Sequence, residues 1–246
     1  MSPRTTPAQA LEFVTAVSRL EVFERFLGRS PCLQAGQRHL AAHLNVGSAA
    51  QAFNAAMRGI AADAGTWLVW VHQDVLLPAG WDQQFLRSLR AAQQAMPELA
   101  VAGVYGLGGR PAHSQRAGHV LDRGHLLREP APLPFPADTL DELLFAVRSD
   151  TRLELDPALG FDFYATDLVL RAKDQGWQAA VVDAYCEHWS DTPAGEAISD
   201  ALAERILRNG RAFEARWSHR FPLETTWLVL NAPGDVARFV DKLRRT

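Results

Sequence analysis

Cysteines are scarce in this sequence of 246 residues, and long apolar runs are missing. The two cysteines, Cys32 and Cys186, are too few for a disulfide framework and too far apart for a zinc-site spacing, so we expect free buried thiols. No stretch approaches the length of a membrane helix, and the first residues, Met-Ser-Pro-Arg-Thr-Thr-Pro, contain no apolar signal core. These absences predict a soluble cytoplasmic protein.

An excess of positive charge is also missing. The chain carries 25 basic and 28 acidic residues, with a formal net charge of -3 and no long run of one sign. A protein that binds a phosphate backbone usually has a basic domain, so we expect no nucleic-acid partner. The hydrophobic content of 48% is ordinary for a globular protein with a real core. The length fits one large domain or two small ones, and we expect a single domain over residues 1–246 with its core at about 11–222.

The stretch from Thr66 to Trp81 is the most informative part of the chain. Its run of β-branched and aromatic residues is apolar on both faces, as in a buried strand, and a Pro-Ala-Gly turn follows it. Three polar residues, His72, Gln73 and Asp74, come where this strand ends. Because ligands of open α/β sheets bind at the carboxyl ends of the strands, these residues form a candidate site for a metal ion or a phosphate.

Strand-like and helix-like segments alternate along the rest of the chain. We expect further strands at residues 11–18, 39–44, 99–105 and 177–184. We expect helices at about 19–27, from Ser48 to before Gly65, and at 81–95, 163–176 and 198–217. The segment 140–148 fits either a strand or a helix. The alternation predicts an α/β fold with a mostly parallel sheet flanked by helices.

Composition changes between Gly106 and Pro136, where glycine, proline and histidine are frequent. The sequence from Gly118 to Leu127, with Arg123-Gly124 at its centre, predicts a β-hairpin. Regular elements resume on both sides, so we interpret residues 106–136 as a hairpin-rich insertion at the edge of the sheet. The last part of the chain, residues 197–246, is predicted to be a helical tail.

His72 and Asp74 are the first candidates for chemistry. Residues two apart on a strand share a face, so both side chains can reach one cation while Gln73 points away. His188 follows the last predicted strand and lies at the same end of the sheet if the strands are parallel. The alternative is structural: His72 is then an interior histidine with satisfied hydrogen bonds, and Asp74 caps the helix after Pro78.

The turn Asn45-Val-Gly47-Ser48, with Asn54 in the helix that follows, is a second candidate. Backbone N–H groups at a helix amino terminus favour a phosphate or the edge of a base, although an ordinary capped turn has the same sequence. Four acids form a third group, in which each is either a general base or a solvated or capping residue. They are Asp141, Glu142, Asp162 and Asp167.

Taken in order, these segments resemble a bacterial glycosyltransferase of family 2 with a GT-A fold, in the branch associated with capsule or cell-surface glycan synthesis. The likeness covers about residues 11–222. Its components are Asn45-x-Gly47 with Asn54, His72-Gln-Asp74 with Leu-Pro-x-Gly-Trp81, Leu140-Asp141-Glu142, Gly160-Phe-Asp162-Phe-Tyr164-Ala-Thr-Asp167-Leu-x-Leu-Arg171, Gly176-Trp177 and His188. The order of the set carries the resemblance more than any single motif.

The resemblance implies transfer of a sugar from a nucleotide-sugar donor with the help of a divalent cation, Mn or Mg. In that family an acidic motif binds the cation on the donor diphosphate, and by resemblance Asp74 would be its principal ligand here. His72 stands where the family has the first acid of an Asp-x-Asp motif. A metal ligand from His72 or His188 favours Mn, which accepts imidazole more readily than Mg.

The resemblance further implies an inverting reaction, in which a carboxylate removes the proton of the acceptor hydroxyl. That base maps to Asp167 or Asp162, and Asp141 and Glu142 would line the acceptor side. The donor nucleotide would contact Thr15, Ala16, Ser18, Asn45, Gly47, Asn54 and Gln73. The implied acceptor is a carbohydrate, a lipid-linked molecule or a protein, and the resemblance is compatible with peripheral association with a membrane.

Two other functions fit parts of the pattern. A sugar nucleotidyltransferase uses a related sheet but needs a glycine-rich, basic loop after the first strand, and the segment Ser18-Arg19-Leu-Glu-Val has no glycine. A non-catalytic nucleotide- or glycan-binding domain would keep the fold and lose part of the acidic motif, in agreement with His72 in place of an acid.

Overall fold

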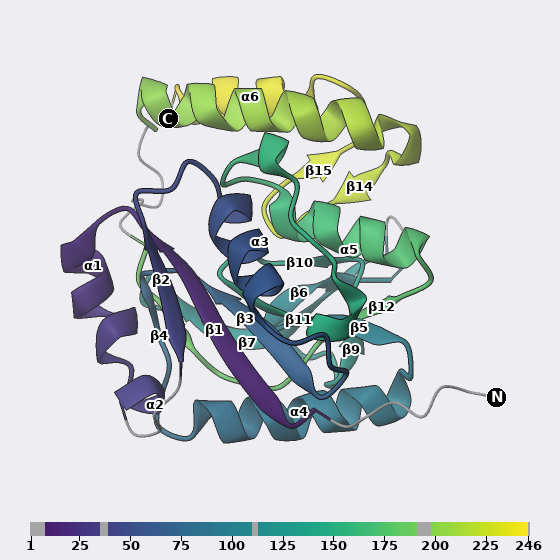
Figure 1. Ribbon diagram of the computed structural model, residues 1–246. Helices are drawn as coiled ribbons and strands as arrows, with labels where there is room; N and C mark the ends of the chain where they lie inside the picture. The colour runs from purple at the N-terminus through teal and green to yellow at the C-terminus, as the bar shows by residue number, and fades with distance from the viewer. Residues whose placement is uncertain (1–7, 35–38, 110–112, 191–197, 246) are drawn as a thin grey trace.

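The computed structural model describes residues 8–34, 39–109, 113–190 and 198–245. A seven-stranded sheet crosses the middle of the molecule (Figure 1). In order across the sheet, its strands are β2 (Leu40–Leu44), β1 (Ala10–Val17), β3 (Thr66–Val71), β11 (Leu144–Arg148), β5 (Leu99–Gly103), β12 (Gln178–Val181) and β9 (Phe135–Pro136).

Most of these strands point the same way. β1 pairs in parallel with β2 and β3, and β5 pairs in parallel with β12. β11 lies between β3 and β5 and is antiparallel to both, and β9 is antiparallel to β12. The predicted α/β fold with a mostly parallel sheet is confirmed. The segment 140–148, which fitted either a strand or a helix, contains β11. Because β11 runs antiparallel to β3, its first residues lie beside the end of β3.

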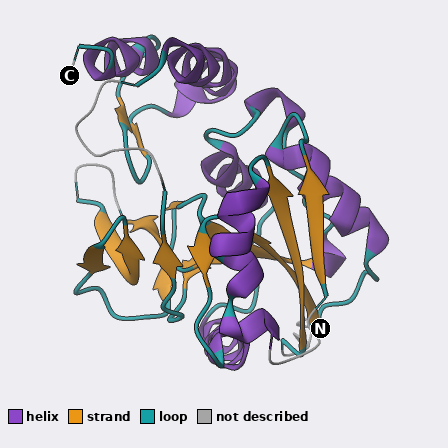
Figure 2. Ribbon diagram, turned by 90° about the vertical axis from the view of Figure 1, so that its left-hand side faces the viewer, coloured by secondary structure: helices purple, strands orange, loops and turns teal. Residues whose placement is uncertain are grey.

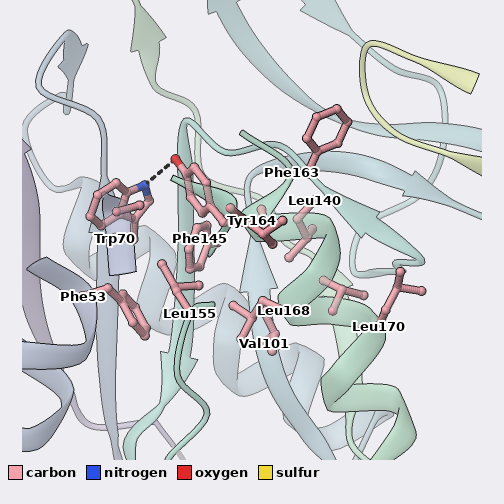
Figure 3. Close-up of a cluster of buried hydrophobic side chains, with 14 of the residues drawn as sticks. Phe53, Trp70, Val101, Leu140, Phe145, Leu155, Phe163, Tyr164, Leu168 and Leu170 are labelled. Atoms are coloured by element: carbon pink, nitrogen blue, oxygen red, sulfur yellow. Dashed lines mark hydrogen bonds between the residues drawn. The ribbon is translucent and has the colours of Figure 1, made fainter. Parts of the chain in front are cut away.

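Helices cover both faces of the sheet, with α3 (Ala49–Gly59) and α5 (Tyr164–Asp174) on one and α4 (Trp81–Ala95) on the other. β3 is buried on both sides, since Trp70 packs toward α3 and α5 whereas Trp67 packs toward α4. Trp70, Phe145 and Tyr164 gather in the first of these layers (Figure 3). Each large apolar side chain buried here stabilises the fold by about 1.5–3 kcal/mol.

A second sheet adjoins the first, in the order β10 (Thr139–Leu140), β6 (Tyr105–Gly108), β7 (Gln115–Asp122), β13 (Glu187–His188) and β4 (Val75–Leu76), with β8 (His125–Arg128) paired to β7. The predicted hairpin is confirmed as β7 and β8. Its turn residues Arg123 and Gly124 have φ angles of 50° and 81°, as in a turn of type I′.

The predicted insertion, residues 106–136, is joined to both sheets. β9 extends the edge of the first sheet beside β12, as expected, but β7 lies in the interior of the second sheet beside β13. Residues 110–112 of this segment lie outside the described residues. The segment is therefore not confined to the edge of a sheet, because β7 pairs with β13 and places Asp122 beside His188.

The remaining elements flank the sheets. Near the amino terminus these are α1 (Leu20–Arg25) and α2 (Pro31–Gln34), and in the last part of the chain α6 (Asp200–Trp217), β14 (Leu223–Glu224), β15 (Val229–Leu230) and α7 (Asp235–Leu243). Short 3-10 turns occur at Leu27–Arg29, Ser149–Thr151, Pro157–Leu159 and Ser218–Arg220.

The last part of the chain is helical, as predicted, but it also contains the small hairpin β14–β15. Figure 2 shows its two helices side by side above the sheets. Within the described ranges, no helix has both the length and the apolar character needed to cross a membrane.

Candidate functional site

A cavity of about 690 Å³ opens at the carboxyl ends of β1 and β3. It is lined by Ala16 and Ser18 at the end of β1 and by Trp70 and His72 at the end of β3. Arg205 of α6 also lines the cavity. The cavity therefore lies where the sheet topology predicts a ligand.

Three residues predicted as metal ligands meet in this cavity. One ligand atom each from His72, Asp74 and His188 lies within 4.8 Å of the other two. The distance from His188 Nε2 to Asp74 Oδ1 is 3.5 Å, and from His72 Nδ1 to the same oxygen it is 3.9 Å. Gly80, not Asp74, occupies the N-cap position of α4, so the structural alternative for Asp74 does not apply.

Strand register brings His188 to this place. β13 lies between β7 and β4, so that His188 is paired with Asp122 on one side and with Val75 on the other. The backbone N–H of Trp189 donates to the carbonyl of Asp74 over 2.9 Å. Asp74 and Asp122 therefore lie on opposite sides of the His188 ring, and Nδ1 of that ring is 2.8 Å from Asp122 Oδ1.

The donor set fits a divalent cation. Asp74 Oδ1 is buried and accepts no hydrogen bond from the described residues. A buried carboxylate oxygen without a donor costs free energy, and a cation between it and the two imidazole nitrogens would remove that cost. One carboxylate and two imidazoles suit Mn or another transition metal better than Mg, which prefers oxygen ligands.

Burial and neighbouring charges separate the pKa values of this cluster. Burial lowers the pKa of His72 to about 4, so its ring is neutral at pH 7. Burial alone would raise the pKa of Asp74, but the contacts with His188 and His72 outweigh it and lower the pKa to about 2. Burial alone would lower the pKa of His188, but its hydrogen bond to Asp122 and the negative charge of Asp74 nearby raise the pKa to about 10.

Asp141 and Glu142 lie next to this cluster because β11 runs antiparallel to β3. The backbone N–H of His72 donates to the carbonyl of Leu143 over 2.9 Å. Asp141 Oδ1 accepts from the N–H of Leu143 at 3.0 Å. Burial, followed by the charges of Asp162 and Asp141, holds the pKa of Glu142 well above its usual range. A carboxyl group of this kind exchanges protons closer to neutral pH than an exposed one does.

Asp167 has a structural environment, which corrects its predicted role as a base. Its side chain has no exposed surface. The carboxylate accepts hydrogen bonds from Arg171 Nε at 2.7 Å, Arg216 Nη1 at 3.0 Å and Trp217 Nε1 at 2.9 Å. With both oxygens occupied and no access to solvent, this acid cannot take a proton from an acceptor.

Asp162 is likewise occupied, because it accepts two hydrogen bonds from Arg205, each 3.1 Å long, and one from Asn209 Nδ2 at 2.7 Å. This arrangement holds Arg205 at the cavity and leaves Asp162 poorly suited to be the base. Of the four predicted acids, Asp141 and Glu142, just before β11, are the two that lie next to the cluster.

Some of the residues predicted to bind the nucleotide line the cavity and the others do not. Ala16 and Ser18 line the cavity. Gln73 also lines it, but its amide does not point away as expected: Oε1 accepts from the backbone N–H groups of Ser18 and Arg19 at 3.0 and 3.1 Å. Gln73 thus ties the end of β3 to the end of β1. Thr15 is buried and is not among the residues that line the cavity, and its Oγ1 has no hydrogen-bond partner among the described residues.

The turn before α3 is an ordinary capped turn. Ser48 Oγ accepts from the N–H of Gln51 at 3.2 Å, and the N–H of Gly47 donates to Gln51 Oε1 at 2.6 Å. Asn45 is exposed, with a φ angle of 51°. Asn54 is buried and exchanges two hydrogen bonds with the backbone of Leu155, which corrects its predicted contact with the nucleotide.

Residues of the site that were not among those predicted include Asp122, Tyr164 and Arg205. Asp122 directly precedes the predicted hairpin turn, so the sequence places it at the end of a strand. The sequence does not indicate that this strand also pairs with β13, which contains His188. Tyr164 is within 2.7 Å of His72 Nε2, and no local pattern distinguishes it from other core aromatics. Arg205 belongs to an amphipathic helix with several arginines and has no distinguishing sequence context.

Comparisons with known proteins give distant matches. No family model matches the chain. A protein of Fuscovulum blasticum described as "ATP synthase subunits region ORF 6" is 29% identical over 208 residues, which make up 80% of this chain and 78% of that protein. The crystal structure of GalNAc-T7 with UDP, GalNAc and Mn2+ aligns with a TM-score of 0.47 and 10% identity, over 96% of this chain. This chain spans about half, 54%, of that structure.

Proposed function

We propose that the protein is a nucleotide-sugar-dependent glycosyltransferase of the GT-A type. The observation that carries this proposal is the convergence of His72, Asp74 and His188 on a cavity at the carboxyl ends of β1 and β3. A carboxylate and two imidazoles in such a cavity suit a divalent cation that binds a ligand rich in oxygen atoms. The diphosphate of a nucleotide sugar is a ligand of this kind, in agreement with the resemblance of the sequence motifs.

His72, Asp74 and His188 would hold the cation, with Mn as the preferred ion. When bound, the cation acts as a Lewis acid on the diphosphate oxygens that gain negative charge as the sugar departs. Arg205 and Arg19 are the basic side chains beside it in the cavity wall, and their guanidinium groups would bind the remaining phosphate oxygens. Ala16 and Ser18 would then lie against the nucleoside.

Glu142, with Asp141 beside it, is proposed as the general base. In an inverting transfer the acceptor oxygen forms a bond to the anomeric carbon, the bond to the diphosphate breaks, and the acceptor proton passes to a carboxylate. The raised pKa of Glu142 suits this step, since its carboxylate is a stronger base than an ordinary carboxylate. The acceptor would be a carbohydrate, lipid-linked or protein hydroxyl in cell-surface polysaccharide synthesis, at the cytoplasmic side of a membrane.

Calorimetric titration tests the proposal. The protein is titrated with UDP-, GDP- and dTDP-sugars, each with and without Mn²⁺, and we expect one of the three to bind in a Mn-dependent manner. The variant Asp74→Asn should lose the Mn-dependent part of the affinity. Absence of binding to all three by the folded protein would overturn the proposal.

Turnover separates the proposal from its two rivals. Slow hydrolysis of the bound nucleotide sugar, with release of the free sugar, is expected of a transferase without its acceptor. Binding with no turnover in the presence of any acceptor would favour a non-catalytic binding domain. Release of pyrophosphate from a nucleoside triphosphate and a sugar phosphate would instead identify a nucleotidyltransferase.

A further inference from the structure

Each imidazole of the cluster has one nitrogen turned toward Asp74 and the other held by a second residue. In His188, Nε2 lies 3.5 Å from Asp74 Oδ1, and Nδ1 lies 2.8 Å from Asp122 Oδ1. In His72, Nδ1 lies 3.9 Å from Asp74 Oδ1, and Nε2 lies 2.7 Å from the hydroxyl of Tyr164. The two rings therefore direct one nitrogen each at the same carboxylate oxygen, and the opposite nitrogens are anchored.

Asp122 is itself fixed on both sides. Its Oδ2 accepts a hydrogen bond from Arg123 Nε at 3.0 Å and lies 2.9 Å from Nη2 of the same guanidinium group, which leaves Oδ1 for His188. The N–H of Arg123 donates to the carbonyl of His188 over 2.9 Å, so the backbone locks the same register. Asp122 keeps a negative charge next to Nδ1, which keeps a proton on that nitrogen, so Nε2 is the ring nitrogen that faces Asp74.

Tyr164 performs the same task for His72. Its side chain is buried and stacks edge-on against Trp70, and the indole Nε1 of Trp70 donates to the Tyr164 oxygen over 3.1 Å (Figure 3). The Tyr164 hydroxyl lies 3.3 Å from the carbonyl of Glu142, which accepts its proton. The phenol oxygen is therefore an acceptor toward His72, so we assign the ring proton of His72 to Nε2.

This assignment leaves Nδ1 of His72 with a lone pair that faces a buried carboxylate oxygen. Two acceptors that face each other with no donor between them repel, and Asp74 Oδ1 has no hydrogen-bond partner among the described residues. A positive ion between them turns the repulsion into two bonds. The hydrogen-bond network thus fixes, before any ion binds, the orientation that an ion requires.

We propose that Asp122 and Tyr164 are the positioning residues of a preformed cation site, in which each fixes the orientation and the proton position of one histidine ligand. This inference rests on the proposed function, since it requires that His72, Asp74 and His188 bind a cation. It assigns Asp122 and Tyr164 no contact with the ion or with the substrate. The loss of such an outer partner typically weakens metal affinity by about 10- to 100-fold.

Titration of the folded protein with Mn²⁺ alone tests the inference, with free Mn²⁺ followed by electron paramagnetic resonance. We expect Asp122→Ala and Tyr164→Phe to bind Mn²⁺ about 10- to 100-fold more weakly than the unsubstituted protein. The Mn²⁺ affinity of Asp122→Asn should lie between those of the unsubstituted protein and Asp122→Ala, because an amide oxygen still accepts from Nδ1 but carries no charge. The visible spectrum of the Co²⁺-loaded protein should change in all three variants, which a loss of stability alone would not produce.

Two matched controls are available in the chain. Asp183 forms a second pair of the same kind, with His119 Nδ1 at 3.4 Å from its Oδ1, outside the cluster. Tyr105 donates to Glu129 at 2.5 Å and lies in the second sheet. We expect Asp183→Asn and Tyr105→Phe to leave Mn²⁺ affinity and the Co²⁺ spectrum unchanged.

The outcomes separate this inference from the proposed function. If the unsubstituted protein binds Mn²⁺ and the folded Asp122→Ala and Tyr164→Phe variants bind it equally well with the same Co²⁺ spectrum, the positioning roles are wrong and the cation site stands. If the unsubstituted protein does not bind Mn²⁺, both the cation site and the positioning roles are wrong. Circular dichroism melting of the metal-free variants establishes that each is folded.

Discussion

Asp162 holds the guanidinium group of Arg205 through two hydrogen bonds, from Nε to Oδ2 and from Nη2 to Oδ1, each 3.1 Å long. Asn209 donates to Oδ2 of the same carboxylate over 2.7 Å. A Cβ atom at position 160 would lie 2.7 Å from Asn209 Nδ2, so glycine at this position allows Asn209 to reach Asp162. The group fixes a positive charge at the wall of the cavity that contains His72 and Asp74.

Arg205→Gln should weaken the binding of Mn²⁺-pyrophosphate by about 10- to 100-fold, because it removes a charged hydrogen-bond donor from the proposed diphosphate position. Arg208→Gln, an exposed arginine on the same helix, is the matched control and should bind as the unsubstituted protein does. Isothermal calorimetry measures both. Equal affinities in the two variants would show that Arg205 only ties α6 to the turn before α5.

Glu142→Gln should lower the turnover number for sugar transfer by about 10²- to 10⁴-fold, since it removes the proposed base. Binding of Mn²⁺ and of the donor should be nearly unchanged, because Glu142 is not a proposed ligand of either. Glu154→Gln, which alters an exposed ion pair with Arg58, is the control. Turnover is measured with the donor identified by titration, and full activity in Glu142→Gln would contradict the assignment.

The stability of Glu142→Gln relative to the unsubstituted protein should depend on pH. Burial raises the pKa of Glu142 well above its ordinary value of 4.5, so folding favours the protonated form. Stability from this group is complete below pH 4.5 and is lost as the pH rises toward the folded pKa, by up to about 1.4 kcal/mol per pH unit. Urea unfolding should therefore show Glu142→Gln gaining stability relative to the unsubstituted protein as the pH rises. A constant difference between pH 4 and pH 8 would argue against the shift.

Asp167→Asn should destabilise the fold by about 2–3 kcal/mol, because it leaves Arg171, Arg216 and Trp217 without their shared carboxylate. Mn²⁺ affinity should not change, since Asp167 has no exposed surface. Asp174→Asn on the same helix alters only a half-exposed ion pair with Arg220 and should cost less than about 1 kcal/mol. Chemical denaturation measures the stability. A loss of activity in Asp167→Asn with unchanged stability would restore its role as a base.

Local sequence was sufficient for the elements that depend on neighbouring residues. The run after Thr66 forms β3, Ser48 caps α3, and the helix expected at residues 81–95 has the same bounds in the structure. The hairpin turns at Arg123-Gly124, where both residues have positive φ angles and only Gly124 adopts such an angle without steric cost. In each case a side-chain pattern, a cap or a turn within a few residues determines the backbone.

The direction of β11 and the position of β13 depend on the whole fold. No local pattern indicates that Leu144 pairs with Val71, or that His188 lies between Asp122 and Val75. These pairings join residues more than 60 positions apart, and they determine which acids lie beside the cluster. Sequence therefore predicted His72, Asp74 and His188 as a group, and tertiary structure supplied their partners Asp122 and Tyr164.

Asp167 shows the same division most clearly. The sequence determined that an acid lies in the first turn of a helix with a Leu-x-Leu-Arg pattern, which the family resemblance connects with a catalytic base. Only the tertiary structure decided that Arg216 and Trp217, from a helix about 50 residues later, occupy its oxygens. A carboxylate is a base or a structural anchor according to which donors the fold places around it, and those donors come from distant parts of the chain.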